Sequence, residues 1–85
     1  MRAVHVTRHG GPEVLELVDL PVPEPGPGEV RVRVAAISLN HLDVWVRRGM
    51  PGVEIPMPHV PGCDGTGTVD ALGPDVEGLE VGAPV

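Results

Sequence analysis

"EVRVRVAAIS" (residues 29–38) and "NHLDVWVRRG" (residues 40–49) differ in the spacing of their apolar side chains. The first stretch alternates valine with charged residues and then becomes fully apolar. Alternation with a period of two indicates a β-strand with one exposed face, and a continuous apolar run indicates burial of both faces. We therefore predict a strand over residues 29–38 that is half-exposed at its start and buried on both faces at its end.

The second stretch has the signals of a short helix over residues 40–49. Asn40 suits the N-cap position, and Asp43 places a carboxylate in the first turn, where the helix dipole is positive. Two arginines suit the last turn, and Gly49 suits the residue that ends a helix. Capping alone therefore accounts for Asn40 and Asp43, and any role in a site has to be weighed against it.

Glycine, proline and alternating apolar residues divide the rest of the chain into short strands and connections. Prolines lack the N–H group that a β-ladder needs, so proline-rich segments are connections. Strands are predicted at residues 2–7, 13–20 and 65–73, the first two as an antiparallel hairpin, with another strand beginning at residue 79 and with connections at 21–29 and 50–62. Short strands with one short helix predict a mainly β fold, a small and partly open β-barrel.

Composition bounds the size of the core and the class of partner. A chain of 85 residues is one small domain with little core of its own. The net charge is −6 with scattered acidic residues, whereas nucleic-acid binding needs clustered basic residues. Cys63 is the only cysteine, so no internal disulfide forms, and no apolar stretch has the pattern of a signal or membrane segment. We expect a cytoplasmic protein without a nucleic-acid or membrane partner.

One glycine pattern, "GCDGTG" (residues 62–67), approaches the G-x-G-x-x-G of dinucleotide-binding turns. Such a turn follows a strand and opens a helix whose N-terminus receives the pyrophosphate. Here the glycines follow a proline loop and open an alternating run. We therefore predict no dinucleotide site within this chain.

Three segments together resemble one superfamily: "GPEVLEL" (11–17), "PVPEPGPGEVRVRVAAISLNHLDVWVRRG" (21–49) and "PHVPGCDGTGTVDALGPDVEGLEVG" (58–82). Their order resembles the N-terminal part of medium-chain dehydrogenase/reductases, which include alcohol dehydrogenases and quinone oxidoreductases. The resemblance implies a GroES-like β-barrel, the catalytic lobe, which in the family precedes a Rossmann domain that binds NAD(P)H. Residues 1–85 are then a single, incomplete GroES-like domain, and the Rossmann domain is absent from this chain.

The resemblance also bears on metal binding. In zinc-dependent members, the segment matching "NHLD" begins with a zinc-ligating cysteine, and the one matching "GCD" carries a histidine and a glutamate. Asn40, Cys63 and Asp64 occupy these positions here. Catalytic zinc takes three ligands from cysteine, histidine and carboxylate, and an amide is a poor substitute. We expect no zinc, and Cys63 and Asp64 are the weak metal candidates.

The motifs are closer to those of zinc-independent quinone oxidoreductases, N-x-x-D and P-G-x-D-G-x-G. This resemblance implies hydride transfer from NADPH or NADH to a quinone or unsaturated carbonyl compound. Asn40 matches a position that lines the nicotinamide and substrate cleft, where an amide can donate to an oxygen that gains charge. His41 matches a position near the cofactor and suits a proton shuttle, its alternative being a plain surface residue. Both are candidate catalytic and cofactor-binding residues.

Two further residues are predicted to be interior. Cys63 suits a small buried side chain in the glycine-rich turn, because no lysine or arginine nearby in sequence would stabilise a thiolate. Trp45, the only aromatic residue, suits an anchor of the helix in the core. The alternative for Trp45 is a substrate pocket edged by Met50 and Met57.

Two functions of different class follow. In the first, the chain is the N-terminal catalytic portion of an NAD(P)H-dependent oxidoreductase and is inactive alone. In the second, it is a stand-alone, truncated GroES-like module with a structural or binding role that self-associates as a homo-oligomer. The strand predicted to begin at residue 79 and to stop at Val85 favours truncation.

Overall fold

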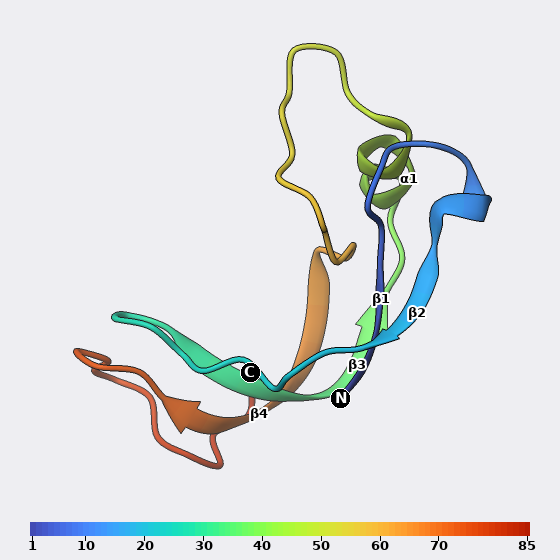
Figure 1. Cartoon of the computed structure of the whole chain (residues 1–85). Helices are drawn as coiled ribbons and strands as arrows, with labels where there is room; N and C mark the ends of the chain where they lie inside the picture. Colours follow the sequence, from blue (N-terminus) through green and yellow to red (C-terminus); the bar gives the residue numbers. More distant parts are fainter. The chain divides into compact units, whose positions relative to one another are not determined.

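The computed structural model describes all 85 residues, which form four β-strands, a 3₁₀-helix and an α-helix (Figure 1). The chain divides into two compact units. One consists of Met1–Pro21 with Leu39–Cys63, and the other of Val22–Ser38 with Asp64–Val85. Neither helix has the length and apolarity needed to cross a membrane.

The first unit contains a two-stranded antiparallel sheet of β1 (Arg2–His5) and β2 (Glu16–Asp19). The predicted antiparallel pairing of these segments is confirmed. Just beyond β1, Val6 and His59 each donate a backbone N–H to the other's carbonyl at 2.9 Å. This pair of bonds attaches the proline-rich connection to the end of the sheet.

A 3₁₀-helix, η1 (Pro12–Val14), replaces the start of the strand predicted at residues 13–20. Proline fixes the backbone dihedral that the first helical position needs. The N–H of Val14 then donates to the carbonyl of Gly11 at 3.2 Å. This part of the prediction was wrong, because local bonds curl the chain before β2 begins.

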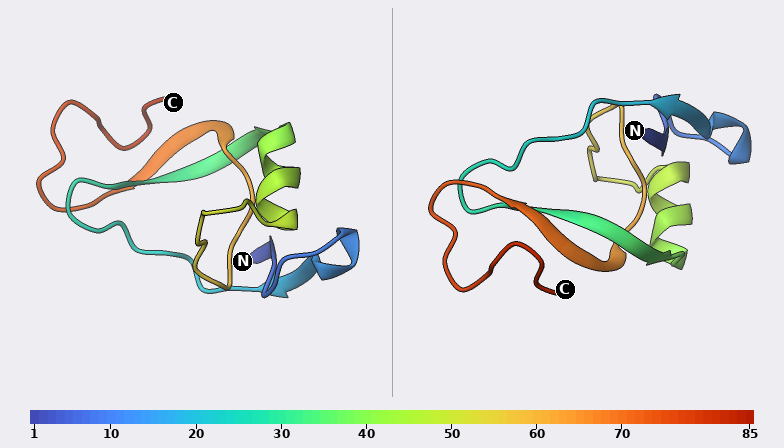
Figure 2. Two further views of the ribbon diagram at one scale, coloured as in Figure 1. Left: turned by 90° about the horizontal axis from the view of Figure 1, so that it is seen from above. Right: turned by 90° about the horizontal axis from the view of Figure 1, so that it is seen from below.

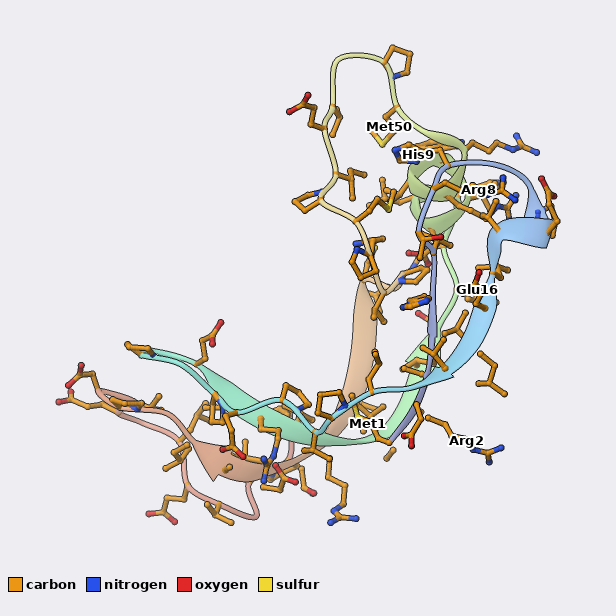
Figure 3. The ribbon with its side chains drawn as sticks, viewed as in Figure 1. Met1, Arg2, Arg8, His9, Glu16 and Met50 are labelled. Atoms are coloured by element: carbon orange, nitrogen blue, oxygen red, sulfur yellow. The ribbon has the colours of Figure 1, made fainter.

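Helix α1 (His41–Arg48) confirms the helix predicted at residues 40–49. It ends at Gly49, whose φ of 97° lies in a region that other residues rarely adopt. His9 secures the same end, because its Nδ1–H donates to the carbonyl of Val46 at 3.0 Å. Figure 3 shows the His9 side chain beside this end of α1.

The second unit is built on the antiparallel pair β3 (Val30–Ser38) and β4 (Asp64–Leu72). The strands predicted at residues 29–38 and 65–73 are thereby confirmed to within one residue at each end. The register shifts twice along the ladder, and such irregularities increase the local twist. Figure 2 shows the curl of these two long strands in two views.

Residues 82–85 lie along the outer edge of β4 without forming a strand. The N–H groups of Gly67 and Val85 each donate to the other's carbonyl at 3.0 Å. Pro84 has no N–H to offer, which keeps the pairing short. The prediction of a strand beginning at residue 79 was therefore wrong.

Few apolar side chains are enclosed. Val6, Val14 and Val69 are the buried hydrophobic residues. On β3, Val34 is 57% exposed and Ile37 is 71% exposed, so the prediction that this strand ends buried on both faces was wrong. A two-stranded sheet has no second layer within its own unit to cover it. The fold is mainly β, as predicted, and neither two-stranded sheet closes into a barrel.

Candidate functional site

The N-terminus of α1 carries Asn40 and Asp43, which form a capping box. The N–H of Asn40 donates to Oδ2 of Asp43 at 3.0 Å, and the Asn40 side chain accepts from the backbone of Asp43. The box satisfies N–H groups that the first helical turn would otherwise leave unpaired. It confirms the predicted N-cap and fixes the place of the Asn40 amide.

Cys63 lies against this cap. Its thiol donates to Oδ1 of Asp43 at 3.3 Å, and the backbone N–H of Gly62 also favours the charged form of that carboxylate. The Cys63 side chain is exposed, so the prediction of a small buried side chain was wrong. A turn so rich in glycine has few neighbouring side chains with which to enclose a thiol.

Asp43 keeps its negative charge more readily than an ordinary aspartate. Its pKa is lowered first by the hydrogen bond from the N–H of Asn40, then by the Cys63 thiol, and to a smaller extent by the N–H of Gly62 and the charge of His59. Partial desolvation opposes these effects without cancelling them. The site therefore presents a carboxylate, held by the Asn40 N–H and the Cys63 thiol, beside the Asn40 amide.

We expect this pKa shift to make stability depend on pH. Because the folded pKa of Asp43 lies below the unfolded one, its contribution is present above the unfolded pKa of about 3.9 and is lost as pH falls through the folded pKa. The melting temperatures of wild type and Asp43→Asn, followed by Trp45 fluorescence, should differ near neutral pH and converge as pH falls below the lowered pKa of Asp43. Asp75→Asn, an exposed loop variant, is the matched control. A constant difference across this range would contradict the prediction.

His41 and Trp45 lie one helical turn apart and stack, with ring centroids 6.1 Å apart and an interplanar angle of 22°. Trp45 is 55% exposed, so its predicted place in the core was wrong. Burying an indole removes about 150–250 Å² from water, more than one short helix and a two-stranded sheet can cover. The pair forms an aromatic surface on α1.

Asp64 belongs to the other unit, where it opens β4 and accepts a hydrogen bond from Oγ of Ser38 at 3.3 Å. Nowhere in the chain do three histidine, cysteine, aspartate or glutamate side chains gather closely enough to hold a metal ion. A catalytic zinc needs three protein ligands. The residues present, Cys63 and Asp64 included, therefore do not fit a zinc centre.

The glycines of residues 62–67 lead into β4. A dinucleotide-binding turn has to open a helix, whose N-terminal N–H groups receive the phosphates. These residues therefore do not fit a Rossmann phosphate site. Asn40 and His41 lie next to each other at the exposed start of α1.

Comparison with known proteins gives consistent matches. Residues 26–85 match the alcohol dehydrogenase GroES-like domain. The quinone oxidoreductase of Lama guanicoe is 37% identical over 83 residues, which make up 96% of this chain and 25% of that protein. A crystal structure of an NAD-dependent alcohol dehydrogenase is 63% identical, with a TM-score of 0.87 over 99% of this chain and 24% of that one. Mycobacterial Rv1454c complexed with NADPH is 41% identical, with a TM-score of 0.88 over 99% and 26%.

The chain therefore belongs to the alcohol dehydrogenase GroES-like domain family of the medium-chain dehydrogenase/reductase superfamily. The resemblance seen in the order of its motifs is confirmed. The chain spans about a quarter of the length of these relatives.

Proposed function

We propose that these residues are the N-terminal catalytic portion of a zinc-independent, NAD(P)H-dependent oxidoreductase that reduces a quinone or another conjugated carbonyl compound. The observation that carries the proposal is the capping box, which holds the amide of Asn40, a poor metal ligand, at the start of α1. The quinone oxidoreductases among the relatives support it. In the complete protein, residues 1–85 belong to a partly open GroES-like barrel, and a Rossmann domain outside them binds the cofactor.

In this proposal the nicotinamide supplies hydride, and the residues of this chain orient the acceptor. The amide of Asn40 donates a hydrogen bond to the carbonyl oxygen, which gains negative charge as hydride arrives. Because the cap already fixes Asn40, the donor needs no rearrangement when the substrate binds. His41, the next residue and exposed, donates the proton that the reduced oxygen takes up, a task that suits imidazole near neutral pH.

The test is a chimera in which residues 1–85 replace the matching segment of a quinone oxidoreductase relative. We expect quinone-dependent oxidation of NADPH, followed by its absorbance, and no stoichiometric zinc in elemental analysis. The 85-residue chain alone should show neither activity nor saturable NADPH binding. Saturable binding by the chain alone would refute the claim that it lacks a cofactor site. Stoichiometric zinc that disappears in Cys63→Ser would overturn the zinc-free mechanism.

A second candidate function is a stand-alone, self-associating module. It is favoured by the large apolar side chains that remain exposed, Val34 and Ile37 among them, since such surface is commonly covered by a partner. Sedimentation equilibrium of the 85-residue chain should then show a homo-oligomer, whereas a monomer that melts cooperatively would exclude this role. Either role suits the cytoplasm, because a single cysteine provides no disulfide framework.

A further inference from the structure

Trp45 is the largest apolar side chain of the protein and stays more than half exposed. The chain has no other tryptophan, tyrosine or phenylalanine. The imidazole of His41 stacks against the indole and limits its orientation. An indole held in this way offers a flat surface to another planar ring, and offset stacking is the arrangement that aromatic rings prefer.

A cavity of about 320 Å³ adjoins the indole. This volume is within the range of small-molecule sites. Figure 3 shows Met50 at the end of α1, and its flexible thioether suits contact with ring edges. Of the two methionines considered as edges of a pocket, Met50 lines this cavity and Met57 does not. The lining residues are Trp45, Arg48, Gly49, Met50 and Pro51.

The charge of the cavity comes from Arg48, which is exposed and takes part in none of the four ion pairs of the structure. Its neighbour Arg47 is engaged instead, because its Nε–H donates to the carbonyl of Gly10 at 3.2 Å. The C-terminus of a helix normally disfavours anions. Here the carbonyl of Arg47 accepts from the N–H of Gly10 at 2.9 Å, and that of Val46 accepts from His9. These bonds reduce the negative potential beside Arg48.

We propose that this cavity binds a planar, conjugated ring that carries an anionic group, with the ring stacked on Trp45 and the anion paired with Arg48. Planar conjugated carbonyl compounds are the substrate class proposed above, so the inference rests on that function where it takes the ligand to be the substrate. It adds a preference for negatively charged members of the class.

The probe is anthraquinone-2-sulfonate, whose fused rings leave no free alkene carbon to which the Cys63 thiol could add. Its uncharged match is 2-(hydroxymethyl)anthraquinone. Since Trp45 is the only tryptophan of the chain, which also has no tyrosine, the protein fluorescence reports binding at this one site. We expect saturable quenching by the sulfonate and weaker binding of the uncharged probe. Quenching that rises linearly, as for free tryptophan, would overturn the proposal.

The variants separate the two contacts. Arg48→Gln should raise the Kd of the sulfonate about fivefold, as expected for one exposed ion pair, and leave the uncharged probe unaffected. Arg33→Gln, at an exposed arginine of the other unit, should change neither Kd. Trp45→Leu, measured by calorimetry, should weaken both probes about tenfold. Equal affinity of wild type for the two probes, or no effect of Arg48→Gln, would refute the preference for anions.

These titrations use the 85-residue chain without cofactor. An inactive chimera would therefore refute the proposed oxidoreductase and leave the binding result in place. Conversely, an active chimera with no binding at Trp45 would refute this inference alone. Emission of Trp45 that changes with protein concentration and is insensitive to both probes would show that a second copy of the chain covers the site, which would also refute it.

Discussion

Gly67→Ala is expected to lower the free energy of unfolding by about 2–3 kcal/mol, because the added methyl group has no space. A Cβ atom at Gly67 would overlap the carbonyl oxygen of Arg33 and would lie 2.9 Å from its carbonyl carbon and 3.0 Å from Cα of Val34. These are backbone atoms of β3, so the strain is relieved only if β3 and β4 separate. For a chain with three buried valines, a loss of this size removes much of the total stability.

Gly65→Ala is the matched control, two residues earlier on the same strand. The nearest atoms to its added Cβ would be the carbonyl oxygen of Ala36 at 3.6 Å and Cγ2 of Ile37 at 3.7 Å, which are ordinary contacts. Loss of a flexible glycine from the unfolded chain should leave its stability unchanged or slightly raised. Urea unfolding followed by far-ultraviolet circular dichroism measures both variants. Equal stability of the two would mean that the close approach at Gly67 does not exist in solution.

In the active chimera, Asn40→Ser is expected to lower kcat by about 10²–10³ without loss of thermal stability. Serine is as good an N-cap as asparagine, since its hydroxyl oxygen accepts from the helix N–H groups. It lacks the amide N–H that the proposed mechanism aims at the carbonyl oxygen, and losing one such donor typically has an effect of this size. The measurements are the rate of NADPH oxidation and the melting temperature.

Two further variants of Asn40 distinguish its role in capping the helix from its proposed role in catalysis. Asn40→Asp keeps the cap and adds a negative charge beside an oxygen that gains charge, so it should lose at least as much activity as Asn40→Ser. Asn40→Ala should lose activity and also about 1 kcal/mol of stability, because the cap disappears. Wild-type kcat in Asn40→Ser would show that Asn40 is a helix cap and nothing more.

The parts of the fold that local chemistry determines could be predicted from the sequence. The alternation of valine and arginine defined β3, and Asn40, Asp43 and Gly49 bracketed α1 nearly to the residue. In each case the signal lies within a few residues of the structure that it specifies. The 3₁₀-helix was missed although its signal, Pro12 after two glycines, is equally local, because the alternating run that follows it is also compatible with a strand.

Burial could not be predicted, because it depends on segments far apart in the sequence. Trp45 and the end of β3 were placed in a core from their apolar character, yet each lies on a unit too thin to enclose it. The link between Asp43 and Cys63 was missed for a related reason. The two residues are separated by a proline-rich loop, and nothing in its composition tells which residue at its far end returns to the helix.

The segment of residues 82–85 has a consequence for association. By bonding to Gly67 and Val69 it covers the middle of the outer edge of β4, whereas the outer edge of β3 has no partner strand along its length. A sheet with one long unpartnered edge can accept one further full-length strand. Two copies that paired through β3 would satisfy each other and leave no edge for a third, so growth along this direction would stop at a closed pair and would not continue into a fibre.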